Sequence, residues 1–316
     1  MAEFPPHFLR ADDLDAEQLT DLLDLADRLK AARGSTGPEA NGDALAGRTV
    51  ALVFEKPSTR TRVSFEVAVA ELGGHPLPLS SAELQLGRGE TIADTAAVLS
   101  RFVHAIVIRT FGQDRIDELA ANASVPVVNA LTDLEHPCQA LADLQTLRAA
   151  RGGQLAGSVL TYVGDGNNVA HSLLLAGAMA GVEIRVAHPD GYAPDRAIVA
   201  RAEQLAAASG TEVVVTTDAV AAVGGAHAVY TDVWASMGQE AEAEARLEVF
   251  QPYRVTPELF AHAAADDAVF LHCLPAHRGE EVAAEVIDGP ASRVFDQAEN
   301  RLHAQKALLV RLLADG

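Results

Sequence analysis

The chain alternates short runs of aliphatic and β-branched residues with longer stretches, rich in Ala and Leu, that have the apolar spacing of helices. Strands that alternate with helices are typical of parallel sheets covered by helices on both faces. The predicted strands are Thr49–Phe54, Ala105–Arg109, Pro126–Asn129, Val159–Gly164, Glu183–Ala187, Glu212–Thr216, Ala228–Thr231 and Ala268–His272. The predicted helices include Thr59–Leu72, Thr91–Phe102, Cys138–Arg151, Val169–Ala180, Arg196–Ala208 and Asn300–Leu313. This pattern predicts an α/β fold with doubly wound parallel sheets flanked by helices.

The length of the chain indicates more than one domain. A chain of 316 residues suits two α/β domains of about 150 residues each, because single cores rarely grow larger. The strongest boundary signal is the turn Arg151-Gly152-Gly153-Gln154, which follows a long predicted helix. We therefore expect a first domain over residues 1–150, a second over residues 151–297 and a terminal helix over residues 298–316.

The charge and the cysteine content narrow the choice of partners and compartment. The formal net charge is -20, and so acidic a surface repels nucleic acid phosphates and anionic lipids. Cys138 and Cys273 are far apart in the sequence, which fits a reducing compartment better than a disulfide framework. The N-terminus has no apolar signal core, and no stretch approaches the roughly 18 apolar residues of a membrane span. We expect a cytoplasmic protein that binds neither nucleic acid nor membrane.

Polar residues cluster where predicted strands end, which is where open α/β sheets bind ligands. The segment after Thr49–Phe54 opens a helix and places hydroxyl groups and a guanidinium at its start, on Ser58, Thr59, Arg60 and Thr61. A helix N-terminus with such donors is suited to phosphate oxygens. The alternative is that Ser58 only caps the helix. Arg62 lies two residues beyond Arg60 and faces another direction, so we expect it to pair with a carboxylate.

Two further motifs fall in the first predicted domain. Arg109 ends a strand, and His136-Pro137-Cys138-Gln139 opens a helix. An imidazole can donate a hydrogen bond to a carbonyl oxygen, and a glutamine amide can accept one from an NH2 group. His136 and Gln139 could therefore grip a carbamoyl group, O=C–NH2, although a capping histidine is the simpler alternative. We interpret Cys138 as a packing residue.

The second predicted domain has three motifs at strand ends. In Gly164-Asp165-Gly166-Asn167-Asn168 the dinucleotide fingerprint is incomplete, since Val169 replaces its third glycine, and we interpret Asn168 as a contact to a small polar ligand. Asp232 could hold an ammonium group, and the turn at Ser236-Met237-Gly238 could hold a carboxylate. The alternative is a surface turn in which Trp234 only packs as an anchor. The segment His272–Glu281 matches no standard zinc spacing, so we expect no metal.

Taken in order along the chain, these motifs resemble the ornithine carbamoyltransferases. The resemblance runs from Phe8-Leu9 to Asn300-Arg301. The motifs of the first half resemble the carbamoyl phosphate domain that all carbamoyltransferases share. Ser236-Met237-Gly238 and His272-Cys273-Leu274-Pro275 point to ornithine as the acceptor. The family transfers the carbamoyl group of carbamoyl phosphate to the side-chain amine of ornithine and gives citrulline in arginine metabolism.

The resemblance implies roles for individual residues. Carbamoyl phosphate would be bound by Ser58, Thr59, Arg60, Thr61, Gln85, Arg109, His136, Gln139, Leu274 and Arg301. Ornithine would be bound by Asn168, Asp232, Ser236, Met237 and Cys273, and the catalytic groups would be Arg109, His136, Cys273 and Arg301. Gln85 would enter the site of a neighbouring subunit in a homotrimer. The terminal helix would return to the first domain, the Leu274–Pro275 bond would be cis, and no cofactor is implied.

Five alternatives remain open from the sequence. An aspartate carbamoyltransferase would need basic residues where Asp232 and Ser236-Met237-Gly238 stand. A putrescine enzyme would have no α-carboxylate to bind, and acetylornithine is a further possible acceptor. A non-catalytic sensor of carbamoyl phosphate or an amino acid is disfavoured because the motifs around Arg60, Arg109, His136 and Cys273 are all intact. A nicotinamide oxidoreductase is supported by the incomplete glycine motif alone.

Overall fold

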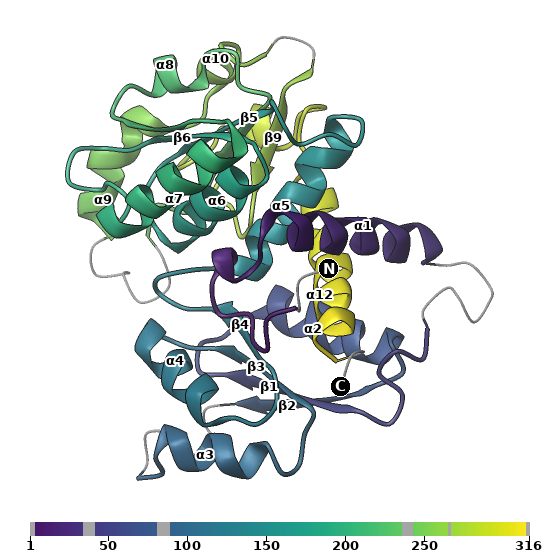
Figure 1. The fold of residues 1–316 in the computed structure, drawn as a ribbon. Coiled ribbons are helices and arrows are strands. Elements are labelled where there is room, and N and C mark those ends of the chain that lie inside the picture. The colour runs from purple at the N-terminus through teal and green to yellow at the C-terminus, as the bar shows by residue number, and fades with distance from the viewer. Residues whose placement is uncertain (1–3, 34–41, 81–88, 236–242, 265–266, 314–316) are drawn as a thin grey trace. The chain divides into compact units, whose positions relative to one another are not determined.

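The computed structural model describes residues 4–33, 42–80, 89–235, 243–264 and 267–313. The chain forms two compact units, and Figure 1 shows that each contains one sheet with helices around it. Unit 1 comprises Met1–Ala142 and Glu299–Gly316, and unit 2 comprises Asp143–Ala298. The divisions fall inside two helices, α5 (Pro137–Ala150) and α12 (Val294–Leu313). Within the described ranges no helix is both long and apolar enough to cross a membrane.

Unit 1 contains a four-stranded parallel sheet in the order β2-β1-β3-β4. Strands β1 and β3 are central and supply buried residues such as Val53 and Ile108 to the core, which suits parallel strands covered on both faces. The strands are β1 (Thr49–Phe54), β2 (His75–Ser80), β3 (Ala105–Arg109) and β4 (Val127–Leu131). The α-helices outside α5 and α12 are α1 (Ala16–Ala32), α2 (Thr59–Glu71), α3 (Ile92–Leu99) and α4 (Gln113–Asn122), and a 3-10 turn spans Ala11–Asp13.

Strand β2 is absent from the strands that the sequence predicts. Its sequence contains Pro76 and Pro78, which have no backbone N–H to donate. A central strand must donate N–H groups to the strands on both of its sides, so prolines are poorly tolerated there. The structure places β2 at the edge of the sheet, beside β1 alone, where proline is tolerated. The proline pattern therefore marks an edge strand of the sheet.

Unit 2 contains a five-stranded parallel sheet in the order β7-β6-β5-β8-β9, which places the carboxyl ends of β5, β8 and β9 next to one another. The strands are β5 (Val159–Val163), β6 (Glu183–Ala187), β7 (Val213–Thr216), β8 (Ala228–Thr231) and β9 (Val269–His272). The helices are α6 (Asn168–Met179), α7 (Arg196–Ser209), α8 (Ala219–Val223), α9 (Ala243–Phe250), α10 (Pro257–Phe260) and α11 (Ala284–Ile287), with a 3-10 turn at Gln251–Tyr253. Two helix-flanked parallel sheets confirm the predicted fold class.

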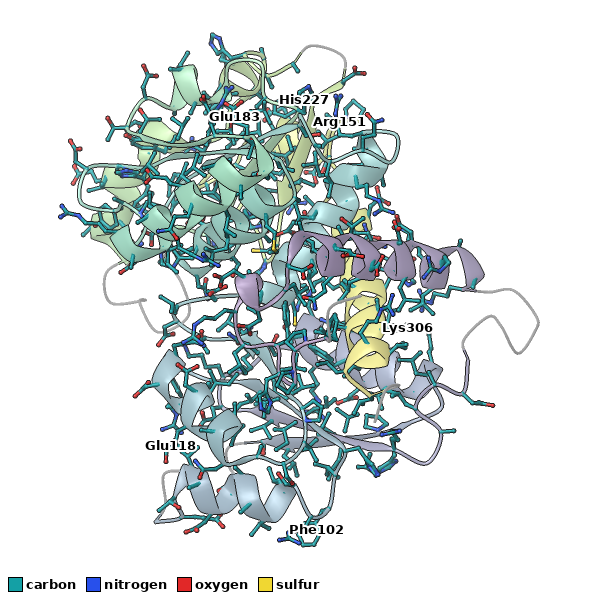
Figure 2. All side chains as sticks on the ribbon, in the orientation of Figure 1. Phe102, Glu118, Arg151, Glu183, His227 and Lys306 are labelled. Carbon is teal, nitrogen blue, oxygen red and sulfur yellow. The ribbon has the colours of Figure 1, made fainter. Side chains whose placement is uncertain are left out.

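The last residues of α12 belong to unit 1 and are held there by ionic contacts. Lys306, labelled in Figure 2, is fully buried, and its Nζ lies 2.9 Å from the carboxylate of Glu71 on α2. Burial alone would raise the pKa of Glu71, but the charges of Lys306 and Arg33 outweigh it and leave that pKa lowered. Lys30 of α1 donates to the side chain of Asn300 at 2.7 Å. These bonds fix this half of α12 against α1 and α2.

Candidate active site

The predicted anion cradle lies at the start of α2. Ser58 is the N-cap, and its hydroxyl accepts a hydrogen bond from the backbone N–H of Thr61 at 3.3 Å. Thr59, Arg60 and Thr61 form the first turn, whose N–H groups lack partners within the helix. Phe54, the last residue of β1, pairs in register with Arg109 of β3. The cradle and Arg109 therefore start from neighbouring strand ends, and capping by Ser58 is compatible with an anion site.

The ends of these two strands are tied together by Glu55. Its carboxylate accepts a hydrogen bond from Arg115 Nη2 at 2.7 Å and another from the hydroxyl of Thr110, and its backbone N–H donates to the carbonyl of Arg109 at 2.9 Å. The sequence patterns indicate no role for Glu55 or Arg115. The available signal was an acidic residue placed directly between a strand and an anion-binding turn.

His136 lies among cationic groups in unit 1. It is buried, and its pKa is lowered well below the usual value by burial and by the charges of Arg301, Arg109 and Arg60. Arg301 also donates from Nη2 to the hydroxyl of Thr61 at 2.5 Å. The structure thus gathers residues from the ends of β1 and β3, the start of α5 and the last half of α12. A neutral imidazole among arginines is suited to donate to an oxygen that gains negative charge.

The lowered pKa of His136 should make folding stability depend on pH. Unfolded histidine binds a proton below about pH 6.5, whereas folded His136 does so only at lower pH. The free energy of unfolding is therefore highest above about pH 6.5. It falls by about 1.4 kcal/mol per pH unit below that value, until folded His136 is protonated as well. We expect His136→Gln to remove this part of the difference between urea unfolding at pH 7.5 and pH 5.5. His75→Gln, at an exposed position of unit 1, is the control, and an equal effect of both changes would contradict the assignment.

Two other residues of unit 1 have structural roles, as predicted. Burial raises the pKa of the Cys138 thiol to about 12, and its Sγ donates to the carbonyl of Asn129 at 3.3 Å. Arg62 is exposed and pairs with Glu66 one turn later, 2.6 Å away. Gln139 is buried in the first turn of α5, three residues after His136. The predicted pairing of Arg62 with a carboxylate is confirmed.

In unit 2 two of the predicted residues, Asp232 and Cys273, meet at the carboxylate of Asp232, which directly follows β8. Its Oδ1 accepts hydrogen bonds from the backbone N–H of Val233 at 2.8 Å and from the thiol of Cys273 at 3.0 Å. Its Oδ2 accepts one from the side-chain amide of Asn167 at 2.9 Å. Cys273 follows β9 and Asn167 precedes α6, so three neighbouring strand ends supply this cluster. Asp232 is a buried carboxylate that can hold an ammonium group.

The thiol of Cys273 acts as a hydrogen-bond donor. Burial and the adjacent charge of Asp232 raise its pKa well above the usual value, so the sulfur keeps its proton at neutral pH. The next peptide bond, Leu274–Pro275, is cis, which confirms the prediction. The backbone N–H of Leu274 donates to Nδ1 of His272 at 2.8 Å. A protonated thiol can orient a neighbouring polar group but is a poor base.

Asp232, His272 and Cys273 also place potential metal-ligand atoms within 4.8 Å of one another. Nδ1 of His272 accepts from Leu274, so Nε2 carries the ring proton and donates to Glu281 at 3.2 Å. The thiol of Cys273 donates to Asp232. Metal binding would have to break the bond from Cys273 to Asp232 and one of the two bonds of His272, so the arrangement favours hydrogen bonding over ligation.

The remaining predicted residues lie partly within and partly outside the described structure. Asn168 is the first residue of α6, next to Asn167, which the sequence analysis did not select. Trp234 is buried and packs against Phe250, with ring centroids 5.9 Å apart. Gln85, Ser236 and Met237 lie outside the described residues. The preference of asparagine for helix N-caps applies to both residues, so the sequence alone does not single out Asn167.

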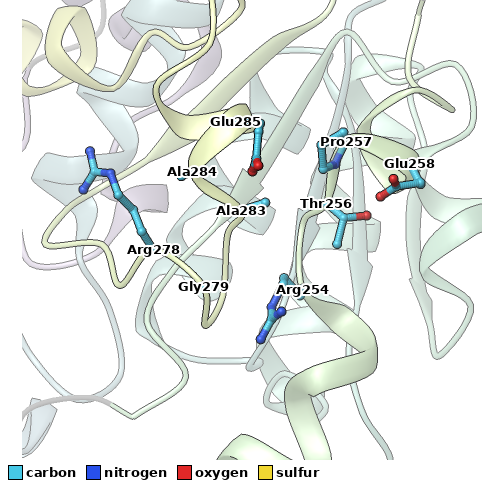
Figure 3. A pocket seen from close by; sticks show the side chains of 9 residues that line it. All are labelled: Arg254, Thr256, Pro257, Glu258, Arg278, Gly279, Ala283, Ala284 and Glu285. Atoms are coloured by element: carbon cyan, nitrogen blue, oxygen red, sulfur yellow. The ribbon is translucent and has the colours of Figure 1, made fainter.

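A groove of about 410 Å³ lies elsewhere in unit 2 and is lined by none of the predicted residues (Figure 3). Two arginines line it. Arg278 forms a two-pronged ion pair with Asp288, and Arg254 donates from Nε to the carbonyl of Glu280 at 2.7 Å. Glu258 and Glu285 add negative charge to the lining. The groove therefore offers no clear preference for an anion or a cation, and we assign it no ligand.

Comparison with known proteins matches two models of one family to successive parts of the chain. Residues 6–149 match the family model described as the carbamoyl-P binding domain of aspartate/ornithine carbamoyltransferase. Residues 156–312 match the model described as the Asp/Orn binding domain of the same family. Together the two models cover the residues of both candidate clusters.

Individual relatives are similar over almost their full length. The chain is 62% identical over 307 residues to an ornithine carbamoyltransferase of Parafrankia sp., covering 97% of this chain and 96% of the relative. It resembles the solved ornithine carbamoyltransferase of Pyrococcus furiosus with a TM-score of 0.92 and 52% identity, covering 97% and 96% of the two chains. For that of Gloeobacter violaceus the TM-score is 0.87, with 49% identity and coverage of 99% and 100%. The chain therefore belongs to the aspartate/ornithine carbamoyltransferase family.

Proposed function

We infer that the chain is an ornithine carbamoyltransferase, which transfers the carbamoyl group of carbamoyl phosphate to the side-chain amine of L-ornithine and releases L-citrulline and phosphate. The observation that carries the choice of acceptor is the buried carboxylate of Asp232 at the end of β8. An aspartate carbamoyltransferase would need a cation there to hold the extra carboxylate of its substrate. The relatives named ornithine carbamoyltransferase support the same choice.

We propose that residues 1–150 with the terminal helix 298–316 bind carbamoyl phosphate. Ser58, Thr59, Arg60 and Thr61 would hold the phosphate oxygens, and Arg109 would reach both phosphate and carbonyl oxygen. His136 and Arg301 would lie beside the carbonyl oxygen, Gln139 would hold the carbamoyl NH2, and the Leu274 carbonyl would contact the same group. The charges that lower the pKa of His136 support this placement, because they show three arginines acting on one imidazole.

Residues 151–297 would bind ornithine. Asp232 and Asn168 would hold its α-ammonium group, Ser236 and Met237 its carboxylate, and Cys273 would lie near the reacting amine. The three bonds that Asp232 accepts support a fixed, ionised carboxylate, since a carboxylate has about four acceptor sites. Its remaining capacity suits one ammonium N–H.

The proposed reaction begins with the uncharged amine of ornithine. Its nitrogen forms a bond to the carbamoyl carbon, the bond from that carbon to the phosphate oxygen breaks with its electron pair leaving on phosphate, and one amine proton is lost. Negative charge develops on the carbonyl oxygen, where Arg109, Thr61 and His136 would stabilise it. Cys273 keeps its proton, so the basic oxygens of the departing phosphate are the better proton acceptor. Alignment of two small substrates supplies much of the remaining rate enhancement.

A panel of amine acceptors tests this function. With carbamoyl phosphate as donor, we expect citrulline from ornithine and little or no product from acetylornithine, putrescine or aspartate. Preference for putrescine would remove the role of the α-carboxylate site, and preference for acetylornithine would show that the α-amine need not be charged. Binding of carbamoyl phosphate without any product would indicate a sensor.

The anion cradle should depend on the shape of Arg60. We expect Arg60→Lys to raise the KM for carbamoyl phosphate about 10-fold, because a point charge cannot replace a two-pronged donor. Arg62→Lys is the matched control, since Arg62 is exposed and pairs with Glu66. Equal changes in the KM of two stably folded variants would contradict the assignment of the two arginines.

We also propose that the enzyme is a homotrimer in which Gln85 completes the site of a neighbouring subunit. The support is the resemblance of the segment Glu83–Gly89 to the family. Separately prepared Gln85→Ala and Arg60→Ala trimers should each have low activity. After subunit exchange, about one quarter of the sites in an equal mixture should combine an intact Arg60 with a neighbour's intact Gln85, if subunits assort at random around a cyclic trimer.

The control for this experiment mixes Arg60→Ala with Arg109→Ala, whose changes fall in the same cradle of one chain. That mixture should recover no activity. Native mass spectrometry verifies the trimer and the exchange. Lack of recovery in the Gln85 mixture despite proven exchange would place the whole site in one chain.

The proposed compartment is the cytoplasm. Cys138 and Cys273 are both free thiols in the structure, as is usual for proteins of a reducing compartment. Ornithine carbamoylation in arginine metabolism is consistent with that location.

A further inference from the structure

Asn167 makes two different sets of hydrogen bonds with the two ends of its side-chain amide. As the N-cap of α6, its Oδ1 accepts from the backbone N–H groups of Val169 at 2.9 Å and Ala170 at 3.2 Å. The hydroxyl of the fully buried Tyr162 reaches the same oxygen at 3.3 Å. The amide nitrogen points the other way and donates to Oδ2 of Asp232 at 2.9 Å.

The cap fixes the orientation of the amide. Oxygen and nitrogen of an asparagine can usually be exchanged by a flip, but backbone N–H groups can only be met by the oxygen. The nitrogen of Asn167 must therefore face Asp232. Because Val233 and Cys273 both donate to Oδ1 of Asp232, Asn167 is the described donor that holds the second oxygen.

We propose that Asn167 is a positioning residue that sets the direction of the Asp232 carboxylate and thereby the affinity for the ammonium group of the acceptor amino acid. The inference rests on the proposed binding of ornithine at Asp232. Asn167 is held by the start of α6, and through its amide it fixes the orientation of Asp232, which follows β8 and lies 65 residues away in sequence. Without this bond the carboxylate can rotate, and the ligand must meet the cost of ordering it.

The test separates capping from positioning with two substitutions that both keep a cap. Aspartate caps helices as well as asparagine does, and serine nearly as well. Asn167→Ser loses the donor to Asp232, and Asn167→Asp replaces it with a second carboxylate. We expect kcat/KM for ornithine to fall about 10-fold in the serine variant and about 100-fold in the aspartate variant. The KM for carbamoyl phosphate should stay within about twofold in both.

A binding measurement shows whether the loss lies in the amino-acid site. Norvaline has the α-ammonium and α-carboxylate groups of an amino acid but no reacting amine. Titrated into the enzyme with carbamoyl phosphate present, it should bind more weakly to both variants in the same order as the kinetic losses. Melting temperatures close to that of the unchanged enzyme would exclude general unfolding as the cause.

Asp195→Ser is the matched control. Asp195 caps α7 in the same unit by accepting from Ala197 and Ile198 at 2.7 and 3.3 Å, and it makes no described bond to Asp232. We expect its ornithine kinetics to stay within about twofold. An Asn167→Asp enzyme with unchanged kcat/KM for ornithine, or one in which both substrates are affected equally, would reduce Asn167 to a cap and overturn the inference. Citrulline formation by the unchanged enzyme is measured in a separate assay. If no citrulline forms, the proposed function is wrong, and the inference, which rests on it, is wrong as well.

Discussion

Arg109→Met is expected to lower kcat by about 10²–10³-fold, the usual loss when one donor to a developing oxyanion is removed. Methionine keeps part of the aliphatic stem, so packing at the end of β3 should change little. The loss should appear in kcat at saturating concentrations of both substrates, because the charge on the carbonyl oxygen is greatest in the transition state. Steady-state kinetics with both substrates varied measures it.

The control for Arg109 is Arg62→Met, which removes a guanidinium from an exposed position in the same unit. Its kcat should stay within about threefold. If Arg109→Met raises only the KM for carbamoyl phosphate and leaves kcat unchanged, the residue binds the ground state and is not part of an oxyanion site.

Asp232→Asn should lower kcat/KM for ornithine by about 10²–10³-fold. The substitution removes the negative charge that would hold the ammonium group. It also brings amide N–H groups into a cluster where Cys273, Val233 and Asn167 already donate. Binding of carbamoyl phosphate alone, measured by calorimetry, should be unchanged, because the described cradle around Arg60 and Thr61 lies in the other unit.

Asp288→Asn is the matched change for Asp232, since Asp288 pairs with Arg278 on the surface of unit 2. Surface ion pairs contribute little, so this variant should retain the kinetics of the unchanged enzyme. Equal losses in the two variants would mean that the effect of Asp232→Asn is a general one on unit 2.

Much of the architecture could be predicted because parallel strands are buried on both faces and stand out as aliphatic runs. Strands β1, β3, β6 and β8 have the predicted bounds. Helix α12 begins at Val294 rather than at the predicted Asn300. Its first turns include Gln297, a fully buried amide that accepts from the backbone of His272 and donates to Asp143. A buried polar residue leaves no mark in an apolar pattern.

The candidate site was accessible from sequence where a residue ends a strand, as Arg109 does, or directly follows one, as Asp232 does. Residues that act through partners far away in the sequence were not accessible. Asn167 and Asn168 are adjacent and of one type, and what distinguishes them is the bond from Asn167 to Asp232. Glu55 likewise gains its role from Arg115, 60 residues later. Local sequence patterns indicate which strand ends carry site residues. Tertiary contacts decide which neighbouring side chains hold those site residues in place.

The composition of unit 1 from both ends of the chain has a consequence for synthesis on the ribosome. The residues of its sheet emerge first, and Glu299–Gly316 emerges only after the whole of unit 2. Until then Glu71 lacks Lys306, Thr61 lacks Arg301 and Lys30 lacks Asn300. Unit 2 is continuous in sequence and can be complete before unit 1. A chain that lacks Glu299–Gly316 would therefore contain all residues of unit 2 but an incomplete unit 1.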